Sequence, residues 1–428
     1  MKLQYIIIAG SIALAVVALL LFTGVIPGFR SGTPSQSGEI AMWGPLPQNY
    51  LAPALTDFQN RFQNIRITYR EMRSDTYMNA LVDAFASGRG PDIFLLPSDQ
   101  IEKQKERLFV LTSDIYPLRA FRDGFLDSGD IFTAPEGILA LPFTTDPLVL
   151  YWNRDLFQSA GLAQPPSTWD VFSTDATKLK TLSGATITQA GAALGEFSNI
   201  ADAKDILSLL MLQTGNPVVN RTTRKAVFAE RADGLTAGEE AVLFFNSFSD
   251  PRKTSYTWNR TLPEALEAFS AGTLAMYIGF ASDLDAILAK NPHLNFDIAE
   301  VPQIAGGPIK ATYARSYGLA VSKQSRLPAV ALTVMYDLTS FNQQKLLAET
   351  GITPPVLRTL LSNPPENPAL ETFYASAIKA RTWLDPDPER TRSIFQEMAG
   401  SVLSGATRLD TAVRNAQNQI NALFPQTQ

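Results

Sequence analysis

The sequence predicts an α/β fold, in which helices cover a largely parallel sheet. Short apolar segments with strand character alternate with amphipathic helical segments from residue 39 onward, and this alternation is typical of α/β layers. The chain has 428 residues, of which 45% are hydrophobic and 18% charged. At roughly 150 residues per domain, this size and composition predict a globular protein of two or three domains.

The N-terminal segment predicts targeting to a membrane. Residues 6–22 are almost wholly aliphatic, and no charged residue occurs between Lys2 and Arg30. The apolar run is longer than that of a typical cleavable signal, and it lacks both an A-x-A-like cleavage site and a cysteine for lipid attachment. We therefore expect an uncleaved signal-anchor helix over residues 1–29, a flexible linker over 30–38 and an extracytoplasmic body. A cleaved signal is the alternative.

The first hundred residues of the body contain the clearest secondary-structure signals. Apolar residues recur at spacings of three and four in the helical segments, whereas residues 65–69 alternate with period two. The predicted elements are a strand over 39–43, a helix over 51–62, a strand over 65–69, a helix capped by Ser74 and ended by Gly88, and a strand over 93–96. Ligands of such sheets bind beyond the carboxyl ends of the strands. The loops at 44–49 and 97–100 are therefore candidate ligand contacts.

The later part of the body continues this pattern. Residues 138–157 predict two apolar strands separated by a polar break at 144–147. The remaining predicted elements are a helix capped by Ser167 or Thr168, a helix with Pro263 in its first turn, a strand over 274–278 followed by a loop at 279–282, and an amphipathic helix over 409–423.

The composition excludes several kinds of chemistry. With no cysteine, the chain cannot form disulfides, thiol nucleophiles or cysteine-ligated metal sites. The only histidine, His293, lies in a polar break, where we expect an ordinary loop residue. A net charge of -5 gives no reason to expect a nucleic-acid partner. We expect no cofactor, and no residue spacing predicts a metal site.

Several motifs occur together in one order. They are Gly90-Pro91-Asp92-Ile93-Phe94, the segment 141–157 with the sequence LPFTTDPLVLYWNRDLF, Ala160-Gly161-Leu162, Pro166-Ser167-Thr168-Trp169, Phe269-x-x-Gly272-x-x-Ala275-Met276 and Gly351-Ile352-Thr353-Pro354-Pro355. In this combination, over about 300 residues, the chain resembles the extracellular solute-binding proteins of ABC importers, the group that contains the maltose-binding protein. It departs from that group in showing neither a clear cleavage site nor a lipid-accepting cysteine.

The resemblance implies a two-lobed periplasmic-binding-protein fold of type II, preceded by the N-terminal membrane helix. The first lobe would comprise residues 39–146 plus 303–352, and the second lobe residues 147–302 plus 353–428. Crossing strands would join the lobes near residues 144–147, and the ligand would be held between the lobes when they close. The family also implies a monomer that works with the transmembrane subunits of an ABC permease.

Sugar recognition needs aromatic rings for stacking and carboxylates, amides or arginine for hydrogen bonds to hydroxyl groups. Residues of these types lie in the candidate loops and in the segments that the resemblance places at the cleft. The expected ligand-binding residues are Trp43, Asn49, Ser98, Asp99, Asp146, Trp258, Gly279, Phe280, Tyr313, Arg315 and Tyr317.

The main functional hypothesis is a binding component that delivers a sugar or oligosaccharide to a permease without catalysis. One alternative is a membrane-tethered carbohydrate-active enzyme, with Asp99 and Asp146 as its paired carboxylates. Another is a ligand sensor that transports nothing. The sequence leaves the identity of the ligand open, because one fold serves many ligands.

Overall fold

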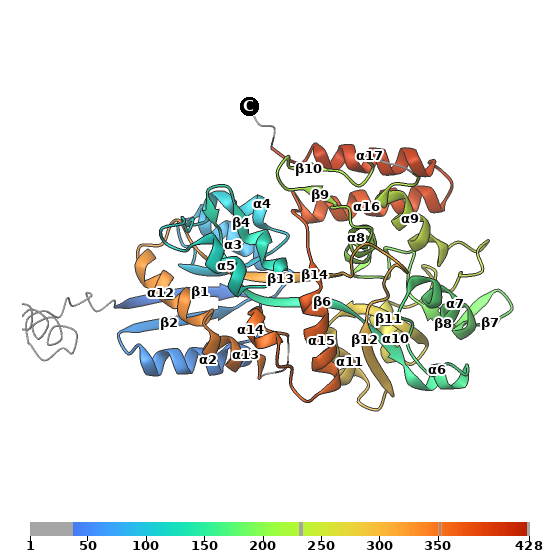
Figure 1. Ribbon diagram of the computed structural model, residues 1–428, viewed down its shortest axis with the longest axis horizontal. Coiled ribbons are helices and arrows are strands. Elements are labelled where there is room, and N and C mark those ends of the chain that lie inside the picture. Colours follow the sequence, from blue (N-terminus) through green and yellow to red (C-terminus); the bar gives the residue numbers. More distant parts are fainter. Residues whose placement is uncertain (1–36, 231–233, 350, 352, 426–428) are drawn as a thin grey trace, which may run out of the picture.

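The computed structural model describes residues 37–230, 234–349, 351 and 353–425, which form two lobes side by side (Figure 1). Helices flank strands in both lobes, so the predicted two-lobed α/β architecture is confirmed. The predicted anchor and most of the linker lie outside the described residues. Within the described ranges, no helix is long and apolar enough to cross a membrane.

The first lobe contains the N-terminal strands and the helices around them. Its elements are β1 (Gly38–Gly44), α2 (Gln48–Arg61), β2 (Ile65–Glu71), α3 (Tyr77–Ala86), β3 (Ile93–Pro97), α4 (Ile101–Gln104), η1 (Lys105–Arg107), α5 (Leu118–Gly124), η2 (Asp127–Phe132), β4 (Thr133–Ala134), β5 (Gly137–Ile138), α12 (Pro328–Leu338), α13 (Phe341–Ala348) and α14 (Arg358–Leu361). Strands β6 (Leu141–Asn153) and β13 (Thr312–Val321) run from this lobe into the other.

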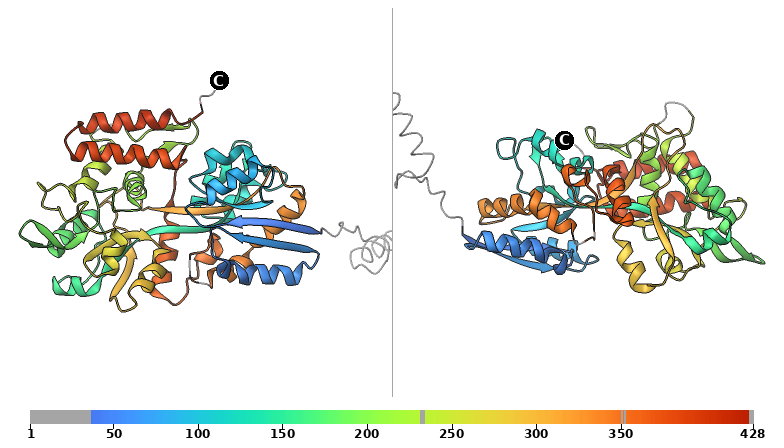
Figure 2. Two further views of the ribbon diagram at one scale, coloured as in Figure 1. Left: turned by 180° about the vertical axis from the view of Figure 1, so that it is seen from behind. Right: turned by 60° about the horizontal axis from the view of Figure 1, so that its bottom comes forward.

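The second lobe contains the middle of the chain and its C-terminal helices, which lie side by side in both views of Figure 2. Its elements are α6 (Arg154–Ser159), α7 (Trp169–Leu179), β7 (Thr181–Ser183), β8 (Thr186–Ala192), α8 (Ala203–Gln213), β9 (Val219–Asn220), β10 (Lys225–Ala226), α9 (Ala237–Ser247), α10 (Ala265–Ser270), β11 (Leu274–Phe280), α11 (Asp283–Lys290), β12 (Phe296–Glu300), α15 (Pro368–Ile378), β14 (Ala380–Arg381), α16 (Pro388–Leu403) and α17 (Leu409–Asn421).

One sheet continues through both lobes in the order β2-β1-β3-β13-β6-β11-β8-β7. The pairs β1–β2, β1–β3 and β11–β8 are parallel, as the sequence predicts. The central pairs are antiparallel, because β13 returns between β3 and β6. The prediction of a largely parallel sheet is therefore wrong for the centre, where sequentially distant strands meet and strand–helix alternation carries no information.

The segment at 141–153 forms one continuous strand and not the two strands that the polar break predicts. It pairs with β13 as far as Pro147 and with β11 from Leu148 onward, so a single strand passes between the lobes. Thr144 and Thr145 are buried within it. Their hydroxyl groups do not break the strand, since β-branched threonine fits a buried pleated backbone once its oxygen finds a partner. For Thr145 that partner is the Ser316 hydroxyl, 3.2 Å away.

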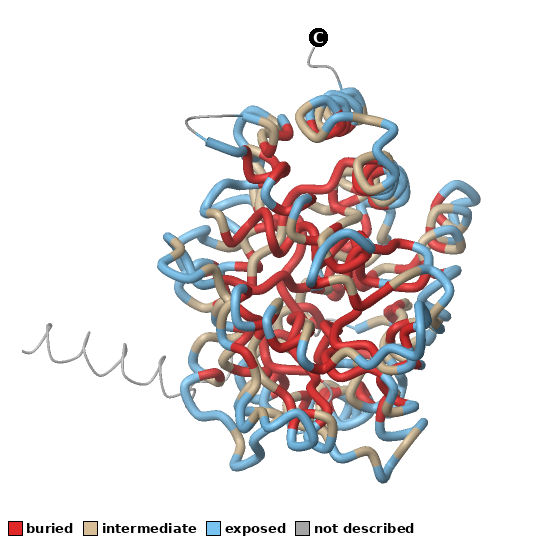
Figure 3. Tube along the Cα trace, turned by 90° about the vertical axis from the view of Figure 1, so that its right-hand side faces the viewer, coloured by how far each residue is buried: buried red, intermediate tan, exposed pale blue. Residues whose placement is uncertain are grey.

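Two hydrophobic clusters stabilise the lobes. One fills the first lobe around Phe58, Leu95 and Met335. A larger one extends from Phe94 across the crossing strands to Phe269 and the rest of the second lobe. Strand β6 is buried along nearly its whole length, so buried chain continues from one lobe to the other. Figure 3, an end-on view of the molecule, shows the buried chain in the interior and exposed segments around it. This continuity makes the crossing strands a well-packed base for any site between the lobes.

The chain passes from one lobe to the other at positions that differ from those that the resemblance implies. Residues 303–311 bind the second lobe, where the Gln213 side chain donates to the Pro302 and Ala311 carbonyls at 3.0 and 2.8 Å. Val356 belongs to the core of the first lobe, and Leu357 bridges to Phe125 there. The residues that lead into α14 thus pack on the first lobe, whereas Leu361 in the helix belongs to a small separate cluster with Leu126, Tyr374 and Ala377.

The capping residues predicted from the sequence located helix ends less accurately than the apolar periodicity located the helices themselves. Helix α3 begins after Thr76 and not after Ser74. Helix α10 is capped by the Glu264 carboxylate, which accepts the Leu266 amide at 2.8 Å, so the preceding proline stands outside the helix. His293 lies exposed in the turn between α11 and β12, as predicted for a loop residue.

Candidate functional site

Arg315 occupies the point where the crossing strands meet, opposite Asp146 in the β13–β6 register. Its guanidinium binds Asp202 at 2.9 Å and Asp205 at 2.5 Å, and it stacks 4.0 Å from the centre of the Phe280 ring. The Arg315 side chain is still 49% exposed. The crossing strand β13 is therefore tied to the second lobe by a partly accessible cation. We call the surroundings of Arg315, formed by Asp99, Asp146, Asp202, Asp205, Tyr313 and Tyr317, the junction.

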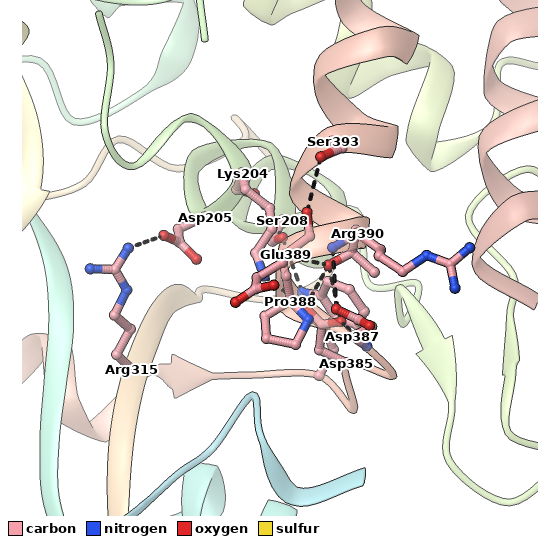
Figure 4. A network of polar contacts seen from close by, with 12 residues as sticks. Lys204, Asp205, Ser208, Arg315, Asp385, Asp387, Pro388, Glu389, Arg390 and Ser393 are labelled. Atoms are coloured by element: carbon pink, nitrogen blue, oxygen red, sulfur yellow. Dashed lines mark hydrogen bonds and ion pairs between the residues drawn. The ribbon is translucent and has the colours of Figure 1, made fainter. Parts of the chain in front are cut away.

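The start of helix α8 supplies the two aspartates, Asp202 as its N-cap residue and Asp205 in its first turn. Figure 4 shows Asp205 pointing at Arg315. Between them in the sequence, Lys204 points toward the opposite side and binds the Asp385 carboxylate at 2.7 Å. The Thr391 hydroxyl also donates to Asp385, with its oxygen 3.0 and 2.8 Å from the two carboxylate oxygens. This buried pair fixes the start of α8 and therefore the direction of its aspartates.

Asp146 points toward the second lobe and is already engaged. Its carboxylate accepts the Ser282 amide at 3.0 Å and the Ser282 hydroxyl at 2.6 Å. Burial raises the pKa of Asp146 to about 6, against the opposing effect of these hydrogen bonds. Burial likewise raises the pKa of Asp202 to about 7. The junction is thus a place where negative charge is poorly solvated.

Three predicted residues at the junction have polar groups without a side-chain hydrogen-bond partner among the described residues: Asp99, Tyr313 and Tyr317. Burial raises the pKa of Asp99, while the nearby cations Lys204 and Arg315 lower it. Tyr313 is only 3% exposed, and burial raises its pKa well above the usual range, with a further contribution from the Asp205 and Asp99 charges. These groups are able to hydrogen-bond a ligand without breaking an existing contact.

Ser98 positions the loop that carries Asp99. Its amide donates to the Ser316 carbonyl at 2.8 Å, and its hydroxyl accepts the Ser316 amide at 3.2 Å. Both bonds fasten the end of β3 to β13. Ser98 is therefore a buried positioning residue whose hydroxyl is occupied.

Gly279 and Phe280 have structural roles at the end of β11. A Cβ atom on Gly279 would lie 2.4 Å from the Asp283 carboxylate and from the Tyr277 ring. The glycine thus leaves room for the Tyr277 hydroxyl to donate to Asp283 at 2.8 Å. Phe280 is buried beneath Arg315, so its ring face binds the guanidinium.

The structure does not bring Trp258, Trp43 or Asn49 to the junction. Trp258 is fully buried, and its indole donates to Asn199 at 3.0 Å inside the second lobe. Trp43 stacks 4.8 Å from the Arg70 guanidinium and lines a separate surface hollow beside α3. Asn49 is exposed at the start of α2, where its side chain accepts the Tyr50 amide.

Sequence reasoning missed Asp202 and Asp205, which form the second-lobe wall of the junction, and Lys204, which binds Asp385 behind them. Their signal in the sequence is three charges within four residues at the start of an otherwise apolar helix. Charged residues on a helix that is buried on all sides need partners. That pattern could have identified a polar site, although not its partner Arg315, which lies 110 residues from Asp205 in the chain.

Polar contacts also connect the lobes at the rim of the junction. Glu102 in α4, which follows the Asp99 loop, forms an ion pair with Arg224 in the β9–β10 turn. Lys103 binds Asp387 at 3.3 Å. The Glu102 side chain is only 7% exposed. The two lobes are therefore in direct contact on the side of α4.

Metal ligation receives no support from the described residues. Within residues 37–425, apart from the positions that the structure leaves out, no group of three or more histidine, cysteine, aspartate or glutamate side chains is arranged to hold a metal ion.

The chain resembles proteins of known family. Residues 43–335 match the sequence profile described as bacterial extracellular solute-binding protein. A Brucella abortus (strain 2308) protein named as a binding protein is 22% identical over 283 residues, which cover 63% of this chain and 64% of that protein. The sn-glycerol-3-phosphate-binding periplasmic protein UgpB of Yersinia pestis bv. Antiqua (strain Antiqua) is 26% identical over 161 residues, covering 33% of this chain and 35% of that protein. The chain thus spans less than two thirds of the length of these relatives.

The fold is shared with solved structures of low sequence identity. The cyclic alpha-maltosyl-1,6-maltose binding protein from Arthrobacter globiformis superposes with a TM-score of 0.76 at 18% identity. The match covers 91% of this chain and 99% of that protein. At this identity the similarity establishes the common two-lobed fold and nothing about the ligand.

Proposed function

Because the chain belongs to the family of bacterial extracellular solute-binding proteins, we propose that it binds a carbohydrate at the junction and delivers it to an ABC permease. The solute-binding family is extracellular, so the body is expected to face away from the cytoplasm.

One observation carries the proposal of a site at the junction. A half-exposed arginine, an aspartate and two tyrosine hydroxyls without side-chain partners gather where the crossing strands join the lobes. Carboxylates, guanidinium and hydroxyl groups are suited to sugar hydroxyls. The ligand named for the Arthrobacter protein of the same fold, a cyclic maltosyl-maltose, is consistent with this class.

The proposed site at the junction offers more polar groups than accessible aromatic rings. Of the aromatic residues predicted for stacking, Tyr317 is half-buried at the junction, while Trp258 and Phe280 are buried. Hydrogen bonding is therefore expected to contribute more than ring stacking to ligand affinity.

We expect binding without turnover. An enzyme with Asp99 and Asp146 as acid and base would need both carboxyl groups free to exchange protons with substrate. Both oxygens of Asp146 are engaged by Ser282, which favours a positioning role for this residue.

The proposal includes attachment to the cytoplasmic membrane through residues 1–29, with the body working as a monomer beside the permease. This part rests on the apolar N-terminal sequence and on the family. A protease-protection assay on spheroplasts, with membrane and soluble fractions probed separately, tests it. Recovery of the body in the soluble fraction would instead favour cleavage of the segment.

Ligand binding is tested by isothermal titration calorimetry of the purified full-length chain against maltose, maltotriose, cyclic maltosyl-maltose, other oligosaccharides and polyols. We expect saturable binding of at least one carbohydrate, an increase in melting temperature by mass action and recovery of the sugar unchanged. Absence of binding across the panel, or consumption of the sugar, would refute the proposal.

A further inference from the structure

We propose that the junction selects carbohydrates without a negative charge and discriminates against their phosphate esters. The inference rests on the proposed function, because it concerns the ligand of that same site. It is not decided by the family, since UgpB is named for an anionic ligand, sn-glycerol 3-phosphate, whereas the Arthrobacter protein is named for a neutral one.

The cations at the junction are already neutralised by the protein. Arg315 binds two carboxylates, those of Asp202 and Asp205, at 2.9 and 2.5 Å. Lys204 is buried and paired with Asp385 at 2.7 Å. A phosphate group prefers a bidentate arginine or a free ammonium. To bind Arg315 or Lys204, a phosphate group would have to displace an aspartate of the protein and leave that aspartate without its cation.

The polar groups that remain available favour neutral hydroxyl groups over anions. The Asp99 carboxylate has no side-chain hydrogen-bond partner among the described residues, and an ionised carboxylate can only accept. A sugar hydroxyl donates to such a group, whereas a phosphate oxygen would be repelled by it. The Asp146 carboxylate is already engaged by Ser282, but it adds a second acidic group beside Arg315 from strand β6.

A second observation, independent of the carboxylates, points to a ligand. Tyr313 is only 3% exposed, and its hydroxyl has no hydrogen-bond partner among the described residues. Tyr313 precedes Arg315 by two residues on strand β13, so both side chains project from the same face of that strand at the junction. A hydroxyl group can donate and accept, which matches a sugar hydroxyl and completes a neutral hydrogen-bonding site.

The test compares each neutral compound with its own phosphate ester by calorimetry on the full-length chain. The pairs are maltose and maltose 6′-phosphate, glucose and glucose 6-phosphate, and glycerol and sn-glycerol 3-phosphate. We expect the neutral member of any pair that binds to have at least a 10-fold lower Kd, and the ratio to fall as salt screens the repulsion. An ester that binds as tightly as its neutral partner would overturn the inference and leave the proposed function intact. Absence of binding by any carbohydrate would overturn the proposed function and the inference with it.

Two variants identify the source of the discrimination. Asp99→Asn removes one negative charge, so it should lower the ratio of the two Kd values at least threefold. Tyr313→Phe removes only a hydroxyl group, so it should weaken neutral ligands and esters alike and leave that ratio unchanged. Asp170→Asn makes the same change in net charge on the exposed start of α7 and serves as the matched control. A ratio that is unchanged in Asp99→Asn, or equally reduced in Asp170→Asn, would contradict the assignment to Asp99.

Discussion

Replacing Lys204 with methionine should destabilise the chain by about 3–5 kcal/mol, the usual cost of breaking a buried ion pair by removing one partner. The structure favours this full range. The Asp385 side chain is completely inaccessible and lies 2.7 Å from the ammonium, so its charge would stay buried with only the Thr391 hydroxyl and the Asp387 amide as donors. Methionine has similar length, so little of the cost would come from a cavity.

The free energy of unfolding is measured by guanidinium titration with circular dichroism and tryptophan fluorescence. Trp383 is a local reporter, because its ring centre lies 5.7 Å from the Lys204 ammonium. The double variant Lys204→Met/Asp385→Asn carries no unpaired charge and should recover at least 2 kcal/mol of the loss. Because burial already raises the pKa of Asp385, the loss in Lys204→Met should be smaller at pH 5 than at pH 8. The reasoning would be refuted by a loss below about 1 kcal/mol in the single variant, or by costs that simply add in the double variant.

Three further outcomes are expected. Burial raises the pKa of Asp146 from 3.8 to about 6, so between these values the native state holds a proton that the unfolded state has lost. The free energy of unfolding should therefore fall as pH rises from 4 through 6. Thermal melts of Asp146→Asn should show a shallower fall, and pH profiles identical to those of the unmodified chain would contradict this. Glu102→Gln removes the ion pair with Arg224 across the lobes, in which Glu102 is buried and the Arg224 side chain is 35% exposed. The contact between the lobes should weaken by about 1–2 kcal/mol, which would raise the ligand release rate about 5–30-fold in stopped-flow experiments. An unchanged rate would exclude a role of this ion pair in lobe closure. Gly279→Ala places a Cβ 2.4 Å from the Asp283 carboxylate and the Tyr277 ring and should cost about 1–3 kcal/mol. Gly400→Ala in the exposed last turn of α16 has open space and should gain up to about 1 kcal/mol, so equal denaturation midpoints of the two variants would argue against this close packing.

The alternation of strands and helices in the first lobe could be predicted from the sequence because it depends on nearby residues, whereas the targeting role of the N-terminal segment stays a prediction. Strands β1, β2 and β3 and helix α2 lie within a few residues of their predicted positions. Periodicity of this kind records which face of an element is buried. The composition also excludes disulfides, thiol nucleophiles and clusters of histidine ligands, since the chain has no cysteine and a single histidine.

The structure brings some of the predicted site residues together and leaves others apart, and ligand binding by any of them stays a prediction. Asp99, Tyr313, Arg315 and Tyr317 do meet at the junction. Aromatic residues were harder to place, because a tryptophan that stacks on a sugar and one that fills a core look alike in a sequence. Trp258 turned out to fill the core.

What the sequence by itself determined is therefore local: the strand and helix periodicity, the apolar N-terminal segment and the absence of cysteine chemistry. The tertiary structure alone decided which chain segments share a lobe, and it brought Arg315 against Asp202 and Asp205. The physical reason is that β13 returns antiparallel between β3 and β6. Such long-range pairing depends on the packing of the whole lobe, so it cannot be predicted from residue spacing within a single strand or helix.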